Sequence, residues 1–107
     1  MLRAQAYIRR HLDDPALSVQ SIADSVELTE NYLSGLYKRE TGENLHHVIT
    51  DLRMERARYL LLHGWHASDV ARRCGYSSFS YFHSVFRRQT GMTPADFARR
   101  NGREQEP

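Results

Sequence analysis

Arginine supplies most of the positive charge that this sequence could use in chemistry. The 107 residues contain fourteen arginines and one lysine, Lys38. The planar guanidinium group donates hydrogen bonds in a fork that fits phosphate oxygens and the edge of guanine. The residue types therefore favour binding to a polyanion such as a nucleic acid. The alternative is that the arginines only form solvated surfaces.

The positive charge is concentrated in the second half of the chain. Residues 1–52 hold five basic and eight acidic side chains, a net charge of −3, whereas residues 53–103 hold ten arginines and three acidic side chains, a net charge of +7. An excess of positive charge attracts polyanions. The second half is therefore expected to contribute more to nucleic-acid binding than the first.

Other reactive side chains form no pattern typical of catalysis or of metal binding. The six histidines include His46-His47 and the pair His63 and His66, but no tight ligand set accompanies them. The lone cysteine, Cys74, excludes an internal disulfide and is expected to be a small core residue. No nucleophile, base and acid stand in a catalytic pattern, so we expect neither an enzyme nor a metal ion or cofactor.

Length and composition predict one small domain, or two very small lobes that share a helix. Hydrophobic residues make up 40% of the chain, which is enough for a core. No apolar run approaches the roughly 20 residues of a membrane span, and no signal-peptide pattern is present. We therefore expect a bacterial or archaeal cytoplasmic protein without a membrane partner.

Helical spacing of apolar residues predicts an all-α fold of about seven helices and no strand. The expected helices cover residues 2–12, 19–26, 30–41, 45–63, 67–74, 78–90 and about 94–100. The expected N-caps are Ser18, Thr29, Asn44, Ser77 and Thr93, and the expected helix stops are Gly42, Gly64 and Gly91. The side chains expected to face the core include Leu2, Ala6, Tyr32, Phe79 and Tyr81.

The chain repeats itself once. Ile22-Ala23 recurs as Val70-Ala71, 48 positions later, and Tyr32-Leu33 recurs as Tyr81-Phe82, 49 positions later. Thr41-Gly42 likewise recurs as Thr90-Gly91. Each copy contains two short expected helices joined by a tight break, which is typical of a helix-turn-helix unit. Two such units in one small chain indicate a protein that reads duplex DNA.

The turn inside each unit needs a residue with positive φ. Gly75 meets this need in the second copy, whereas Glu27 stands in the first, at a cost of about 1 kcal/mol relative to glycine. Thr29 and Ser77 would place a hydroxyl group at the start of each second helix. Helix N-termini attract anions, so these starts can approach phosphates.

The second copy resembles the C-terminal signature of the AraC/XylS-type transcription regulators in Ala71-Arg72-Arg73-Cys74-Gly75-Tyr76-Ser77, Tyr81-Phe82, Phe86-Arg87-Arg88 and Thr90-Gly91-Met92-Thr93-Pro94. The first copy is similar to the upstream half of the same domain in Tyr32-Leu33-Ser34 and Tyr37-Lys38-Arg39-Glu40-Thr41-Gly42. Arg53, Ala57 and Leu60-Leu61 resemble its linker helix. The resemblance covers about residues 3–100.

The resemblance implies two helix-turn-helix subdomains joined by a long linker helix. It divides the chain into a first lobe (1–43), the linker helix (44–64), a second lobe (65–100) and a polar tail (101–107). It implies a sequence-specific transcription regulator that inserts the helices at about 30–41 and 78–90 into successive major grooves of promoter DNA. The chain would then be the C-terminal DNA-binding domain of a larger regulator, preceded by a sensor or receiver domain if the sequence is a fragment. If the sequence is complete, it resembles the small stand-alone regulators of the family.

The resemblance also assigns candidate DNA contacts, position by position. The candidates for base edges are Glu30, Asn31, Ser34, Gly35, Lys38, Ser78, Ser80, His83, Ser84 and Arg87, and the candidates for phosphates are Thr29, Ser77 and Arg88. Asn31 can pair with adenine, whereas Lys38 and Arg87 suit phosphates or guanine. Glu30 could accept a hydrogen bond from cytosine or favour the helix start electrostatically, and both interpretations stay open.

Some positions depart from the family pattern. Gly35 stands where related proteins often carry arginine, Ser84 is short, and His66 replaces the serine that caps the equivalent helix of the first copy. With few long donors, DNA recognition is expected to depend on phosphates, water and DNA shape, with modest affinity. The alternative hypothesis is a protein-interaction module in which only the second lobe grips DNA and the chain contacts RNA polymerase or a partner domain.

Overall fold

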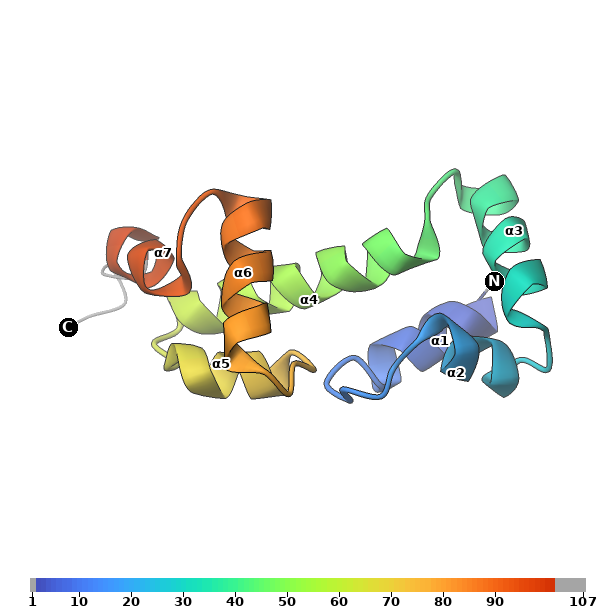
Figure 1. Cartoon of the computed structure of the whole chain (residues 1–107), viewed down its shortest axis with the longest axis horizontal. Coiled ribbons are helices and arrows are strands. Elements are labelled where there is room, and N and C mark those ends of the chain that lie inside the picture. Colours follow the sequence, from blue (N-terminus) through green and yellow to red (C-terminus); the bar gives the residue numbers. More distant parts are fainter. Residues whose placement is uncertain (1, 102–107) are drawn as a thin grey trace.

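The computed structural model describes residues 2–101, which form seven helices and no strand (Figure 1). The helices are α1 (Leu2–Arg10), α2 (Val19–Ser25), α3 (Glu30–Thr41), α4 (Leu45–Leu62), α5 (Ala67–Arg73), α6 (Phe79–Thr90) and α7 (Pro94–Asn101). The all-α class is confirmed, and most ends lie within two residues of the prediction. Asn101 belongs to α7, and the rest of the expected tail, 102–107, lies outside the described residues.

Capping side chains begin the helices where local sequence predicts. Ser18 Oγ accepts a hydrogen bond from Ser21 N–H at 3.1 Å, and Ser21 Oγ accepts one from Ser18 N–H at 2.9 Å, which completes a capping box. Thr29 Oγ1 accepts from Tyr32 N–H at 3.2 Å, and Asn44 Oδ1 accepts from His46 N–H at 2.9 Å. These bonds satisfy backbone donors that a helix start leaves unpaired.

The expected cap of α6 is wrong by one residue. Ser78, not Ser77, is the N-cap, and its Oγ accepts a hydrogen bond from Tyr81 N–H at 3.1 Å. Both serines have the right chemistry, so composition alone does not separate them. The repeat does, because Ser78 lies 49 positions after Thr29, the N-cap of α3.

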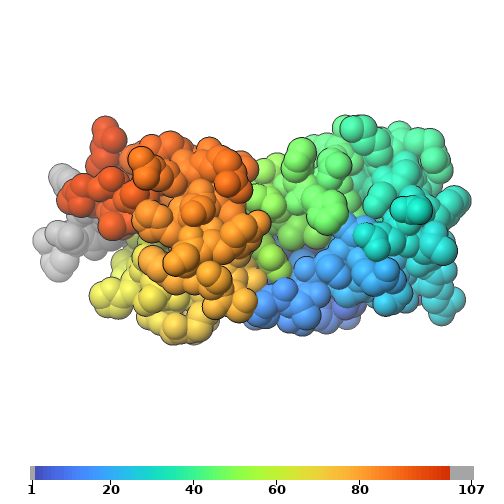
Figure 2. All heavy atoms as spheres, viewed as in Figure 1, coloured from blue at the N-terminus to red at the C-terminus, as the bar shows by residue number. Residues whose placement is uncertain are grey.

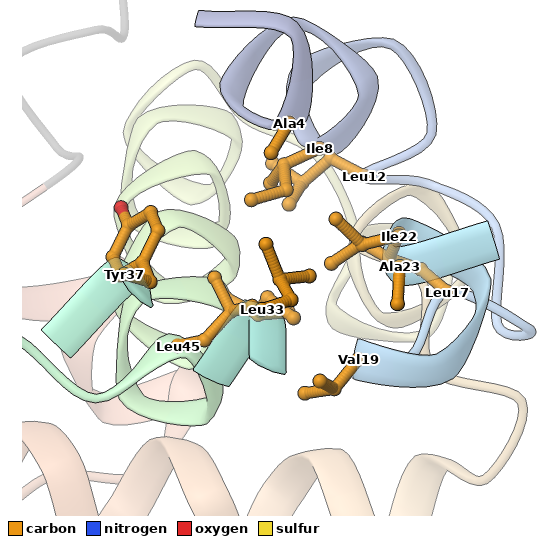
Figure 3. Packing of buried hydrophobic residues seen from close by; sticks show 11 residues of the cluster. Ala4, Ile8, Leu12, Leu17, Val19, Ile22, Ala23, Leu33, Tyr37 and Leu45 are labelled. Carbon is orange, nitrogen blue, oxygen red and sulfur yellow. The ribbon is translucent and has the colours of Figure 1, made fainter. Parts of the chain in front are cut away.

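The molecule has two separate cores, and one packs against each half of α4. The first core contains Ala4, Ile8, Leu12, Leu17, Val19, Ile22, Ala23, Leu33, Tyr37, Leu45 and Ile49. Figure 3 shows Ile8, Ile22 and Leu33 pointing toward one another from α1, α2 and α3. The second core contains Met54, Ala57, Leu61, Val70, Ala71, Cys74, Tyr76, Phe82, Val85 and Phe86. The molecule measures 48 × 24 × 23 Å, with α1–α3 at one end and α5–α7 at the other (Figure 1).

Several apolar side chains that were expected in the core are exposed. Leu2 is 82% exposed, Tyr32 53% and Tyr81 59%, and Ala6 and Phe79 also face solvent. The short helices bury narrow stripes of residues four apart, such as Leu33 and Tyr37 in α3. Successive residues of a helix are rotated by about 100°, so Tyr32 is turned away from the side that Leu33 buries. Within residues 2–101, no helix is both long and apolar enough to cross a membrane.

The turn between α2 and α3 carries a local strain that a substitution should remove. Glu27 has φ 61° and is the one non-glycine residue with positive φ in the described part of the chain. Glu27→Gly should therefore raise the free energy of unfolding by about 1 kcal/mol, measured by urea denaturation. Glu27→Ala is the control because it keeps the Cβ atom. An equal gain from both substitutions would show that the backbone conformation is not the cause.

Candidate nucleic-acid interface

Each lobe contains a helix-turn-helix unit, α2–α3 in the first and α5–α6 in the second. Ala23 and Ala71 are fully or nearly fully buried, as small residues at the crossing of two helices should be. The turns contain Glu27 at φ 61° and Gly75 at φ 88°, which confirms both expected left-handed positions. Small buried residues and left-handed turns therefore hold α3 against α2 and α6 against α5.

The second helix of each unit ends in the same way. The N–H groups of Gly42 and Gly91 donate to the carbonyl oxygens of Lys38 and Arg87, each at 2.8 Å, and both glycines have φ near 80°. The two cations therefore occupy equivalent positions in the last turns of α3 and α6. In Figure 2, atoms of both helices are visible on one face of the molecule.

The candidate base contacts lie at the surface of α3 and α6 or at their starts. The exposed residues of this set are Glu30, Asn31, Lys38, Ser78, Ser80, Ser84 and Arg87, and the half-buried ones are Ser34, Gly35 and His83. The candidate phosphate contacts Thr29, Ser77 and Arg88 are exposed as well. A Cβ atom at Gly35 would meet only the flexible end of Arg39, at 3.5 Å. Packing therefore leaves room for a side chain at position 35. Because glycine has none, α3 projects no side chain toward a partner at this position.

The repeat indicates surface residues that were not among the candidate contacts, namely Tyr32, Tyr81 and Arg39, the counterpart of Arg88. Arg39 lies 49 positions before Arg88, and Tyr32 lies 49 positions before Tyr81. All four are exposed in the structure. Each outward helix surface thus carries an aromatic side chain and an arginine at matching positions.

A groove along α4 separates the two helices. One hollow of about 400 Å³ is lined by His47, Thr50 and Asp51 of α4 and by Tyr81, Val85, Arg88 and Gln89 of α6. A second hollow of about 360 Å³ is lined by Lys38, Gly42, Glu43 and Asn44 and by the α4 residues His47, Val48 and Asp51. His47 and Asp51 line both hollows. They therefore lie between Lys38, which lines the hollow on the α3 side, and Arg88, which lines the one on the α6 side. Sequence reasoning did not find His47 and Asp51.

Few of the arginines are paired with acidic side chains. Within residues 2–101, Arg72 pairs with Asp69 and Arg99 pairs with Asp96, and all four side chains are substantially exposed. The hydrogen bond from Arg99 is the main reason why the pKa of Asp96 lies below its usual value, and a hydrogen bond involving Thr93 adds to it. Exposed pairs of this kind contribute little to stability. Most of the positive charge therefore remains available to an anionic partner.

Comparison with known proteins identifies the family. A family described as a helix-turn-helix domain matches residues 22–100. The structure superposes on the C-terminal domain of AraT, a response regulator from Geobacillus stearothermophilus, with a TM-score of 0.88 and 33% identity over 92% of this chain and 82% of that one. The chain belongs to the AraC/XylS family of transcription regulators. It is a DNA-binding domain of that family.

Two further relatives extend this comparison. RhaR, an HTH-type transcriptional activator from Yersinia pseudotuberculosis, is 39% identical over 75 residues, which cover 69% of this chain and 26% of RhaR. The DNA-binding domain of AdpA, a global transcriptional factor solved in complex with a target DNA, has a TM-score of 0.84 and 26% identity over 95% of this chain and 94% of that one. The chain spans about a quarter of the length of the curated relatives it matches.

His11 and His63 of this AraC-family domain contact residues one helical turn back. Nδ1 of His11 lies 3.0 Å from the carbonyl oxygen of Tyr7, and Nδ1 of His63 lies 2.8 Å from that of Tyr59, in each case one helical turn back. Both imidazole rings also pack on the ring of that tyrosine. Within the described residues, no three histidine, cysteine or acidic side chains are grouped so that they could hold a metal ion. His66, at the start of α5, makes no capping hydrogen bond with its side chain.

Cys74 is fully buried in the second core, as its inward helix position predicts. Burial raises the pKa of its thiol to about 11, and the nearby charges of Arg56 and Arg53 oppose this rise only in part. At pH 8 the folded protein should therefore react with iodoacetamide on the order of a hundredfold more slowly than the urea-unfolded chain, because the thiolate is the nucleophile. Mass spectrometry of quenched samples measures both rates.

An exposed cysteine provides the control for this experiment. Ser68 lies on the solvent side of α5, so Ser68→Cys should react at nearly the same rate in the folded and unfolded states. Equal rates for Cys74 in both states would contradict its assignment as an inert core residue.

Proposed function

We propose that this domain is a sequence-specific reader of double-stranded DNA that inserts α3 and α6 into successive major grooves of a promoter. The observation that carries the proposal is the presence of two equivalent, capped helices with exposed polar residues, both visible on the same side of the molecule (Figure 2). The 18 residues of α4 span about 27 Å, and successive major grooves on one side of a duplex are about 34 Å apart. The lobes at each end of α4 supply the remaining length.

The relation to AdpA supports binding to DNA. AdpA was solved with a target DNA, and this chain matches nearly the whole of its DNA-binding domain. The matched segments cover only about a quarter of the length of these relatives, which supports a role as the DNA-binding part of a larger regulator. In this proposal residues 1–43 and 65–100 are the two DNA-contacting lobes, and residues 44–64 are the linker.

The exposed residues of α3 and α6 have distinct roles in this proposal. Asn31 pairs with adenine, and Lys38 and Arg87 contact guanine or a phosphate. Ser34, Ser80, His83 and Ser84 supply short contacts, directly or through water. Because the Ser78 hydroxyl already accepts the capping hydrogen bond, we place Ser78 with Thr29 near the phosphates at the helix starts. Arg88 and its counterpart Arg39 face the backbone on the flank of each helix.

The charge difference between the lobes supports an unequal share of DNA affinity. The acidic first half leaves open the alternative in which only the second lobe grips DNA and the first contacts RNA polymerase or a partner domain. These two functions differ in whether substitutions in α3 weaken DNA binding. One uncharged polar side chain or imidazole and one cationic side chain can be removed from each of α3 and α6 to make this comparison.

Paired alanine variants distinguish the alternatives. A labelled duplex that the wild-type protein selects from a random pool is titrated with Asn31→Ala/Lys38→Ala and with His83→Ala/Arg87→Ala at several salt concentrations. If both helices contact DNA, each pair should weaken binding by about tenfold or more, and each lost phosphate contact should lower the salt slope by about one. Arg10→Ala, a charge change outside both helices, is the control and should have a smaller effect.

The outcomes separate the two functions. Loss of binding from the second pair alone supports the divided role. Wild-type binding that is nearly independent of salt would contradict recognition through phosphates. No preference of the selected pool for any sequence would overturn sequence-specific reading itself.

A further inference from the structure

Arg53 is the one charged side chain that is buried within the described residues, with 8% of its surface exposed. It stands in the middle of α4, between the last α4 residue of the first core, Ile49, and the first of the second core, Met54. Its Nε donates a hydrogen bond to the carbonyl oxygen of Leu12 at 3.2 Å, and its Nη2 donates one to that of Asp14 at 2.9 Å. The guanidinium group therefore holds the loop that follows α1 in the first lobe.

The same guanidinium group also contacts the second lobe. Its Cζ lies 5.4 Å from the centre of the Tyr76 ring, in the turn between α5 and α6. A Cβ atom on the preceding residue, Gly75, would come within 2.5 Å of the Leu12 carbonyl oxygen and within 2.7 Å of Arg53 Nη2. The turn of the second unit thus touches the loop of the first, and Figure 1 shows the two segments meeting beside α4.

Directional contacts of this kind fix the angle between the two lobes better than apolar packing does. Most helix packing in the molecule occurs within one lobe or against α4. Apolar contact is non-directional, whereas hydrogen bonds from a charged guanidinium group to two carbonyl oxygens hold only in one geometry. A buried charge that loses such partners is costly, so Arg53 fixes the first-lobe loop on α4. Gly75 and Tyr76 of the second lobe pack against the same guanidinium group, so the second lobe cannot rotate freely about this point.

We propose that Arg53, with Gly75, is a positioning residue that fixes the orientation of α3 relative to α6 and thereby the spacing of the two DNA sites that the domain accepts. The effect on DNA spacing rests on the proposed function, in which both helices enter one duplex. The effect on lobe orientation does not depend on DNA.

A distance measurement without DNA tests the orientation. Spin labels are attached at Glu40→Cys on α3 and Ser68→Cys on α5, both exposed positions in different lobes, while the native Cys74 is buried. Double electron–electron resonance then gives the distribution of distances between the labels. We expect one narrow distribution for the otherwise wild-type protein and a shifted or clearly broader one for Arg53→Ala and Gly75→Ala. Arg53→Lys keeps the positive charge but loses the forked hydrogen-bond donors of the guanidinium group. Its distance distribution should therefore be intermediate between those of wild type and Arg53→Ala.

Gly64 supplies a matched control for Gly75. Both have φ +88°, but a Cβ atom at Gly64 would meet no atom within 4 Å. Gly64→Ala therefore introduces the same backbone strain without a clash between the lobes, and its distance distribution should equal that of wild type. If Arg53→Ala fails to fold, as judged by circular dichroism, Arg53→Lys and Gly75→Ala decide the question. Distributions for these two that match wild type would overturn the proposal.

A DNA measurement tests the consequence for spacing. The duplex selected by the wild-type protein is compared with versions in which one base pair is inserted or removed between the two half-sites, and with a duplex that keeps only one half-site. For wild type, each spacing change should weaken binding by about tenfold or more, the size of a lost base contact. For Arg53→Lys the penalty should fall to less than about threefold, with half-site affinity unchanged.

The proposed function and the positioning role of Arg53 can be contradicted independently. If wild type binds no duplex with two half-sites, the proposed function fails, while the label distances still decide whether Arg53 fixes the lobes. If wild type binds such a duplex and Arg53→Lys keeps the full spacing penalty, the positioning role is wrong and the proposed function stands.

Discussion

Neither helix-turn-helix unit of this domain can complete a core alone, and both rely on one helix to do so. Leu45 and Ile49 of α4 close the first core, and Met54, Ala57 and Leu61 close the second. Units of fewer than about 50 residues bury too little surface to be stable by themselves. The distance between the two units therefore follows from folding: a helix long enough to fill two cores in succession also holds the units apart along its own length, about 27 Å for the 18 residues of α4.

The same shortage of core explains why the outer surfaces of α3 and α6 are free for contacts. Each helix buries one narrow stripe, Leu33 with Tyr37 and Phe82 with Phe86. The rest of its circumference is turned to solvent, including the exposed tyrosine beside each stripe. A thicker protein would cover these surfaces with a further layer. Here a thin fold leaves them open, and stability comes instead from caps, left-handed turns and the shared helix.

Features set by neighbouring residues could be predicted from the sequence, and those set by distant ones could not. Caps and positive-φ turns depend on a few adjacent side chains, so Thr29 and Gly75 were predicted correctly. A choice between adjacent residues of equal chemistry, as at Ser78, needed the register of the repeat. Tyr32 was misplaced because an apolar stripe on a short helix can be drawn in more than one way. The resemblance places Arg53 in the linker helix, but its burial and its partners could not be predicted, because the partners lie 39 and 41 positions away.

The uneven charge of the two lobes makes a stiff contact between them important for DNA binding. A basic second lobe that holds DNA would present the acidic first lobe to the neighbouring groove at a high effective concentration, provided that the connection is stiff. A flexible connection would spread the first lobe over many orientations and lose this advantage. A helix alone resists bending better than its two ends resist rotation of the lobes packed on them. The buried guanidinium group, held by carbonyl oxygens of one lobe and packed against the turn of the other, supplies stiffness at the point where α4 cannot.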